Sequence, residues 1–166
     1  MRTAFFSAFL LFTALCRESE ALQVEGPPPK QPIEFNHKLH VTDQKRTCVS
    51  CHAETDGGEL VDMPDVPKCM SCHASITPHT NAERKLAALA KQNRDVDWVR
   101  VYQIPTFVRF SHRQHAQAGA KCEVCHGPVG SRVGLRRERQ LTMGECMNCH
   151  RETKASIDCG SCHEPR

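Results

Sequence analysis

The sequence has too few large apolar residues to build an ordinary globular interior. Leu, Ile, Val and Phe make up 33 of the 166 residues, and seven of those 33 lie within the first 15 positions. There is one Trp and one Tyr. A chain with about one fifth or less of these residues rarely forms a core from side chains alone. The composition therefore excludes a conventional enzyme with a large apolar interior. It leaves either disorder or a core supplied by something other than side chains.

A strong net charge is also missing. The 22 Lys and Arg residues nearly balance the 19 Asp and Glu residues, which leaves a formal charge of +3. A charge this small gives no argument for binding nucleic acid or a membrane surface. We therefore expect no nucleic-acid partner, and membrane contact only through an attached lipid or a partner subunit.

The one long apolar run lies at the N-terminus and is short. Residues 4–15 (AFFSAFLLFTAL) follow Arg2, whereas a spanning helix needs about 20 apolar residues. The run has the length of a signal-peptide hydrophobic region. We predict a signal peptide over residues 1–21 and export to a bacterial periplasm; the alternative is a lipoprotein signal ending at Cys16. Residues 22–34 contain the Pro-rich stretch GPPPKQP, which predicts an extended linker.

Cysteine and histidine are the residues in excess, with 11 Cys and 10 His. Every cysteine except Cys16 belongs to a CxxCH pentapeptide, the attachment signature of haem c. Two thiols at this spacing reach the two vinyl groups of one haem, and the histidine binds its iron. Disulfides or zinc would also use CxxC pairs, but neither requires a histidine after each pair. The five motifs, numbered first to fifth in chain order, are Cys48, Cys51 and His52; Cys69, Cys72 and His73; Cys122, Cys125 and His126; Cys146, Cys149 and His150; and Cys159, Cys162 and His163.

The sequence therefore predicts five covalently bound haem c groups, with the five motif histidines as proximal iron ligands. The other five histidines equal the haems in number, so we expect one distal imidazole on each iron. Four of them lie in two copies of the pattern F-x-H-x-x-H, at residues 35–40 and 110–115. The expected distal ligands are His37, His40, His79, His112 and His115, with Met143 as an alternative to His79.

The motif order reveals an internal repeat. Residues 35–73 and 110–150 each read F-x-H-x-x-H, CxxCH, CxxCH at an offset of 75, and the fifth motif (159–163) is appended. We assign residues 35–166 to one pentahaem domain. Thr80 and Glu83 form a capping box that predicts a helix over residues 81–92, and elsewhere we expect loops and single turns. The expected fold is small and mostly irregular, with a few short helices, little or no β structure and a haem-packed core. Without haem we expect the chain to be unfolded.

The ligand pattern resembles the class III multihaem cytochromes. The second half is similar to the pentahaem cytochrome subunit of alternative complex III and of related quinol-oxidising or molybdopterin-enzyme complexes. The segments that carry this likeness are residues 98–101 (WVRV), Pro105, and residues 107–115 (FVRFSHRQH), 119–130 (GAKCEVCHGPVG) and 141–151 (LTMGECMNCHR). The resemblance implies electron relay between a membrane-bound complex, of the quinol-oxidising or molybdopterin and iron–sulfur type, and another redox protein.

Two imidazoles on an iron leave no open position for a substrate. We therefore expect outer-sphere electron transfer and no catalytic residue. The alternative is a multihaem reductase of nitrite, hydroxylamine or a sulfur oxyanion, which needs one iron with an open position. That alternative requires that neither His79 nor Met143 ligates the remaining iron.

Overall fold

The computed structural model describes residues 26–53 and 61–163. The predicted signal peptide, Cys16 and the first part of the predicted linker lie outside the described residues. The helical elements in chain order are η1 (Lys38–Asp43, a π-helix), η2 (Cys48–Ser50, a 3₁₀ turn), α1 (Val66–His73), α2 (Asn81–Lys91), α3 (His112–Gln117), α4 (Cys122–His126), η4 (Val129–Ser131, a 3₁₀ turn), α5 (Met143–Glu152) and α6 (Cys159–Cys162). The described residues contain no sheet, only isolated bridge residues, among them the antiparallel pair Val108 and His163. This confirms the expected irregular, weakly helical fold.

Side-chain caps fix the beginnings of the longer helices. At α2 the Thr80 hydroxyl accepts from the Glu83 amide and the Glu83 carboxylate accepts from the Thr80 amide, which confirms the predicted capping box. At α1 the Asp65 side chain accepts from the Lys68 amide, and at α5 the Thr142 hydroxyl accepts from the Glu145 amide. Helices α1 and α5 have eight and ten residues, so the expectation of single turns around the haem motifs is wrong there. Their caps are the reason, because each satisfies an amide that the first turn of a helix leaves unpaired.

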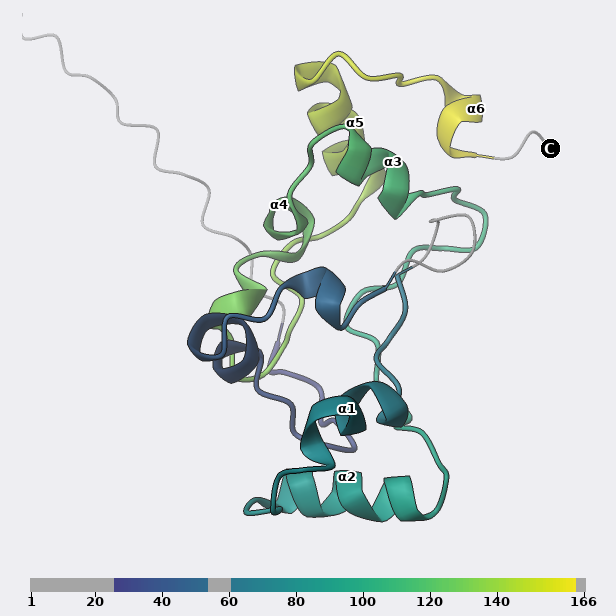
Figure 1. Ribbon diagram of the computed structural model, residues 1–166. Coiled ribbons are helices and arrows are strands. Elements are labelled where there is room, and N and C mark those ends of the chain that lie inside the picture. The colour runs from purple at the N-terminus through teal and green to yellow at the C-terminus, as the bar shows by residue number, and fades with distance from the viewer. Residues whose placement is uncertain (1–25, 54–60, 164–166) are drawn as a thin grey trace, which may run out of the picture.

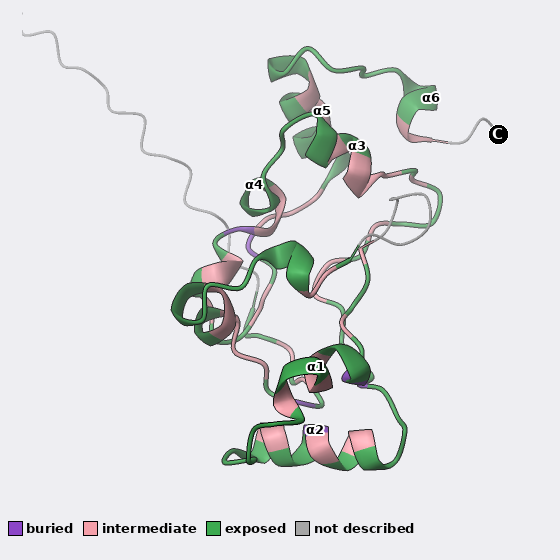
Figure 2. Cartoon of the chain, viewed as in Figure 1, coloured by how far each residue is buried: buried purple, intermediate pink, exposed green. Residues whose placement is uncertain are grey.

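Side chains alone bury very little of this chain. The buried hydrophobic residues of the described part are Ile33, Val66, Leu86 and Val96, which form one cluster between α1 and α2. Figure 2 shows how few segments are buried and how much of the other helices is exposed or half-buried. Large apolar side chains such as Val49 and Val124, inside the first and third motifs, are 71% and 45% exposed. The described side chains therefore form only a small apolar core, as expected if haem supplies most of the interior.

The molecule is elongated. Helices α1 and α2 lie at one end, and α5 and α6 lie at the other (Figure 1). Gln31 exchanges two hydrogen bonds with the Val99 backbone, at 2.8 and 3.0 Å, and Ile33 joins the buried cluster. Residues 31–33 of the predicted linker are therefore packed against the α1–α2 end.

The two repeats meet through η1 of the first and η4 of the second. The Thr42 hydroxyl donates to the Gly130 carbonyl at 2.5 Å, and the Lys38 amide donates to the Arg132 carbonyl at 2.9 Å. A Cβ on Gly130 would lie 2.8 Å from a Val41 methyl, so glycine permits this close approach. The fifth motif attaches to the segment just before the second repeat, where the Arg109 amide donates to the Cys162 carbonyl at 2.8 Å.

Candidate haem-binding sites

The phenylalanine of each F-x-H-x-x-H segment holds both histidine rings of that segment. Phe35 lies edge-on to His37, with ring centroids 4.7 Å apart, and stacks on His40 at 4.4 Å. Phe110 makes the same contacts with His112 at 4.8 Å and with His115 at 4.4 Å. The two repeats therefore share one local geometry, in which the phenylalanine fixes the directions of two imidazoles. The sequence pattern included this phenylalanine, but its role becomes visible only in the structure.

Each F-x-H-x-x-H segment turns its second histidine toward the second CxxCH motif of its repeat. The ring centroids of His40 and His73 are 6.2 Å apart. In the other repeat those of His115 and His150 are 6.0 Å apart. The first histidine of the second pair faces the third motif, with the His112 and His126 rings nearly parallel and 6.4 Å apart.

These separations suit an iron between the rings. Two metal–imidazole bonds of about 2 Å, with the nitrogens on the facing ring edges, place two centroids about 6 Å apart. The remaining first-repeat pair is His37 and His52, which the repeat makes equivalent to His112 and His126. Their electrostatic coupling shows that they are neighbours. The residues present thus fit haem iron at the first four motifs.

Backbone carbonyls fix which nitrogen of several imidazoles carries the proton. Nδ1 of His40 donates to the Asn36 carbonyl at 2.9 Å, and Nδ1 of His115 donates to the Ser111 carbonyl at 2.8 Å. Two proximal histidines do the same: Nδ1 of His52 donates to the Asp62 carbonyl at 2.9 Å, and Nδ1 of His150 donates to the Ser156 carbonyl at 2.6 Å. Because a carbonyl only accepts, the proton lies on Nδ1 and Nε2 keeps its lone pair. This is the usual outer hydrogen bond of a metal-binding histidine.

Burial keeps two further imidazoles neutral. Desolvation, and then the neighbouring His52 and His40, lower the pKa of His37 to about 4. The Nδ1 atom of His37 is buried without a hydrogen-bond partner. Desolvation also lowers the pKa of His126, followed by His112 and His52. A neutral imidazole is the form that binds a metal, so both rings are prepared for that role at neutral pH.

Thiols of different motifs lie close together in a fixed order. Burial raises the pKa of the Cys48 thiol, and Cys122, to which it hydrogen-bonds, raises it further. After burial, Cys51 of the first motif raises the pKa of Cys69 of the second. In the second repeat the Cys146 thiol has a raised pKa, through burial first and then through Cys125 and Cys162. These neighbouring thiols place the five motifs in a row in the order second, first, third, fourth, fifth.

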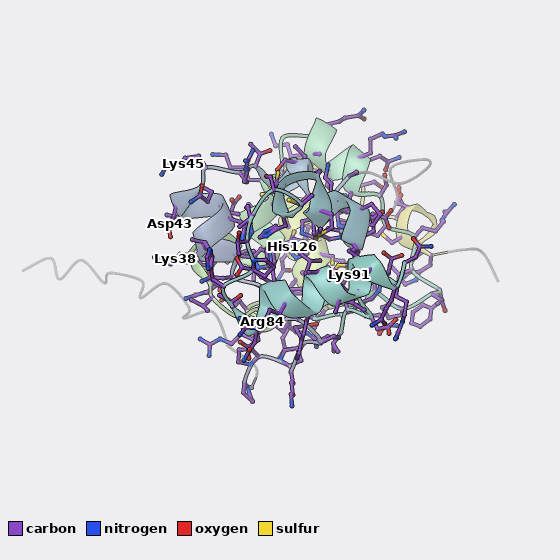
Figure 3. All side chains as sticks on the ribbon, turned by 60° about the horizontal axis from the view of Figure 1, so that its bottom comes forward. Lys38, Asp43, Lys45, Arg84, Lys91 and His126 are labelled. Carbon is purple, nitrogen blue, oxygen red and sulfur yellow. The ribbon has the colours of Figure 1, made fainter. Side chains whose placement is uncertain are left out.

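A shell of residues around the third motif was not found by sequence reasoning. The Tyr102 ring lies edge-on to His126 at 4.9 Å, and its hydroxyl accepts from the Glu138 amide at 2.9 Å. The Glu138 carboxylate is 2% exposed and binds the Arg132 guanidinium through two hydrogen bonds, at 2.5 and 3.1 Å. Gly127, directly after His126, packs against that carboxylate. The available signals were the single tyrosine and one acid within the basic segment RVGLRRER. Figure 3 shows His126 near the middle of the molecule in that view and the labelled charges of η1, Lys38 and Asp43, at its edge.

Two histidines have no histidine partner among the described residues, which include all ten. His79 precedes α2 and is exposed, whereas the other nine histidines are half-buried. His163 follows α6; its ring stacks at 6.1 Å on Phe107, whose carbonyl accepts from Nδ1 at 3.4 Å. Helices α2 and α6 lie at opposite ends of the molecule (Figure 1). Met143, the predicted alternative ligand, is the first residue of α5 and is 62% exposed.

Comparison with known proteins decides the family. The class III cytochrome c family matches residues 16–100, and the family of cytochrome c7 and related cytochromes c matches residues 108–164. The chain belongs to the class III cytochrome c family. This confirms the resemblance seen in the sequence, and the protein is a multihaem c-type cytochrome that binds haem iron and transfers electrons.

Two curated relatives are similar to this cytochrome. The multiheme cytochrome c subunit of menaquinone reductase from Nitratidesulfovibrio vulgaris strain Hildenborough is 30% identical over an alignment of 163 residues. The match covers 81% of this chain and 77% of the relative. The multiheme cytochrome MtrA of Shewanella baltica strain OS185 is 31% identical over 70 residues, covering 28% of this chain and 21% of that protein. Within the described residues, no helix combines the length and apolar character that crossing a bilayer requires.

Proposed function

We propose that this cytochrome is an exported pentahaem protein that passes electrons along its length, between a membrane-bound oxidoreductase and a second redox protein. The observation that carries the proposal is the row of CxxCH motifs joined by neighbouring thiols. A row of haem sites gives electrons a single path with two ends, as a relay between two partners requires.

The residues that would hold each haem follow from the motifs and the facing rings. The two cysteines of a motif form the thioethers, and its histidine binds the iron from one side. Haem c supplies the redox chemistry, because its iron exchanges one electron. The distal ligands are His37 for the first motif, His40 for the second, His112 for the third and His115 for the fourth.

The two repeats meet at equivalent positions. Cys48 and Cys122 are the first cysteines of the first and third motifs, and their sulfur atoms are neighbours. His126 of the third motif is also electrostatically coupled to His52 of the first. The junction between the repeats is therefore a close contact between two haem sites, so electrons cross from one half to the other there.

The partners are inferred from the relatives. One relative is named as a subunit of menaquinone reductase, and it shares most of its length with this chain. We infer that this cytochrome serves a quinone-linked or molybdopterin and iron–sulfur complex at a membrane, without crossing the membrane itself. Residues 1–21, as a signal peptide or as a lipoprotein signal ending at Cys16, would deliver it to the periplasm.

Mass spectrometry and a reductive titration test this function. The mature full-length holoprotein should carry five haem additions and take up five electrons. The matched control is the double variant Cys159→Ser/Cys162→Ser, which removes only the terminal motif and should give four of each. Fewer haems in the wild-type protein would overturn the proposal. So would a catalytic current with nitrite or hydroxylamine on an electrode, because it would favour the reductase alternative.

A further inference from the structure

The fifth motif offers one histidine, His163, as a ligand for its haem iron, and no second histidine ring contacts it among the described residues. Eight of the ten histidines form four facing or neighbouring pairs, which serve the first four motifs. The remaining two are His163, directly after α6, and His79, just before α2. These two helices lie at opposite ends of the molecule (Figure 1). Equal numbers of distal histidines and irons therefore do not produce five pairs.

The backbone of His79 takes part in capping α2. Its backbone amide donates to the Glu83 carboxylate at 2.8 Å, and its carbonyl accepts from the Arg84 guanidinium at 2.9 Å. The residue thus continues the cap of α2 while its side chain lies in solvent. Unlike His40 and His115, it has no phenylalanine that sets the direction of its ring, and no ring contact joins it to another described residue.

His163 is positioned as a proximal ligand only. The bridge between Val108 and His163 attaches α6 to the segment before α3, and the Arg109 guanidinium donates to the Gly160 carbonyl. The Phe107 carbonyl accepts from Nδ1 of His163, so Nε2 keeps its lone pair for the iron. The nearest ring is that of Phe107, which has no atom that binds a metal. Met143, the predicted methionine alternative, begins α5, and the test below includes it.

We propose that the fifth haem iron is bound by His163 alone and that its sixth position takes small exogenous ligands such as carbon monoxide. This inference rests on the proposed pentahaem function. A haem with one imidazole and an open position is the arrangement that binds such ligands, whereas two imidazoles exclude them. The site lies at one end of the row, so ligand binding there would leave the other four haem sites unchanged.

The test measures carbon monoxide binding to the reduced full-length holoprotein and the high-spin fraction of the oxidised protein. We expect about one carbon monoxide per protein, and a high-spin signal from about one haem in five. His79→Ala and Met143→Leu should leave both values unchanged. The matched control is His115→Ala, which removes a ligand that does have a facing partner. It should raise carbon monoxide binding to about two per protein.

Three results would overturn the inference. One is a wild-type protein that is wholly low-spin and binds no carbon monoxide. The second is a new high-spin haem in His79→Ala, which would show that His79 ligates an iron, in its own chain or in another copy. The third is a new high-spin haem in Met143→Leu. Mass spectrometry separates these results from failure of the proposed function, because the haem count stays at five in each of them.

Discussion

Gly127 offers a sharp test of how tightly the chain closes around the third motif. It is buried, directly follows His126 and has φ +71° and ψ −172°, a region that only glycine adopts readily. A Cβ at this position would lie 2.6 Å from Oε2 of Glu138 and 3.1 Å from its Cβ. Gly127→Ala therefore combines backbone strain with a steric clash, and the carboxylate cannot easily withdraw because two hydrogen bonds tie it to Arg132.

The matched control is Gly119→Ala. Gly119 has φ +86°, but a Cβ there would meet nothing within 4 Å. Backbone strain of about 1–3 kcal/mol should affect both variants, and overpacking of about 1–3 kcal/mol should be added only at Gly127. Thermal unfolding of the holoprotein measures the difference, at about 2–4 °C for each kcal/mol in a chain of this size. The ferric spectrum should also change in Gly127→Ala, because His126 is the adjacent residue.

A double-mutant cycle identifies the cause. In a Glu138→Ala background, Gly127→Ala should lose most of its additional cost, because the clashing carboxylate is absent. Equal melting temperatures for Gly127→Ala and Gly119→Ala would refute the reasoning. So would an additional cost that is unchanged by removal of the Glu138 side chain.

Four more predictions concern stability and redox behaviour. Leu86→Ala, in the buried cluster, should lower the free energy of unfolding by about 2–5 kcal/mol. The control Leu39→Ala, at a 44% exposed position, should lower it much less. Denaturant titration measures both changes. Ser111→Ala removes the cap of α3 and should cost about 0.5–2 kcal/mol in the same assay. Haem-free chain should give the circular-dichroism spectrum of an unfolded protein, and a helical spectrum would contradict this. Reduction adds about five negative charges within a small volume, so it should be coupled to proton uptake; potentiometric titrations should show potentials that fall as pH rises, and pH-independent potentials would refute the coupling.

Local features of the fold were predictable where neighbouring residues decide them. The capping box at Thr80 and Glu83 predicted α2 to within one residue of its observed end at Lys91. Comparable signals preceded α1, where Asp65 is followed by Pro67, and α5, where Thr142 is followed by Glu145. They were hidden because the cysteines and histidines of these helices are placed for haem and give no clear apolar stripe.

Contacts between distant segments were only partly predictable. The two F-x-H-x-x-H segments, which are 75 residues apart, have the same geometry because the repeated residues make the same local contacts. The meeting of Cys48 with Cys122 was not predictable, since it depends on how η1 packs against η4. The number of histidines could not indicate that His79 and His163 lie apart from each other and from the four pairs, because a count contains no information about distance; ligation by His79 stays a prediction.

The order of the motifs makes the two at the junction between repeats different from the rest. If a haem at one end of the row is lost, the remaining haems can still pass electrons to one another. If a haem in the middle is lost, the haems on its two sides are separated. Loss of the haem at the first or third motif would therefore leave the haems on either side reducible but unable to exchange electrons with each other. Selection should therefore tolerate substitutions least at the junction between the repeats, although it lies far from the two ends of the row where redox partners would bind.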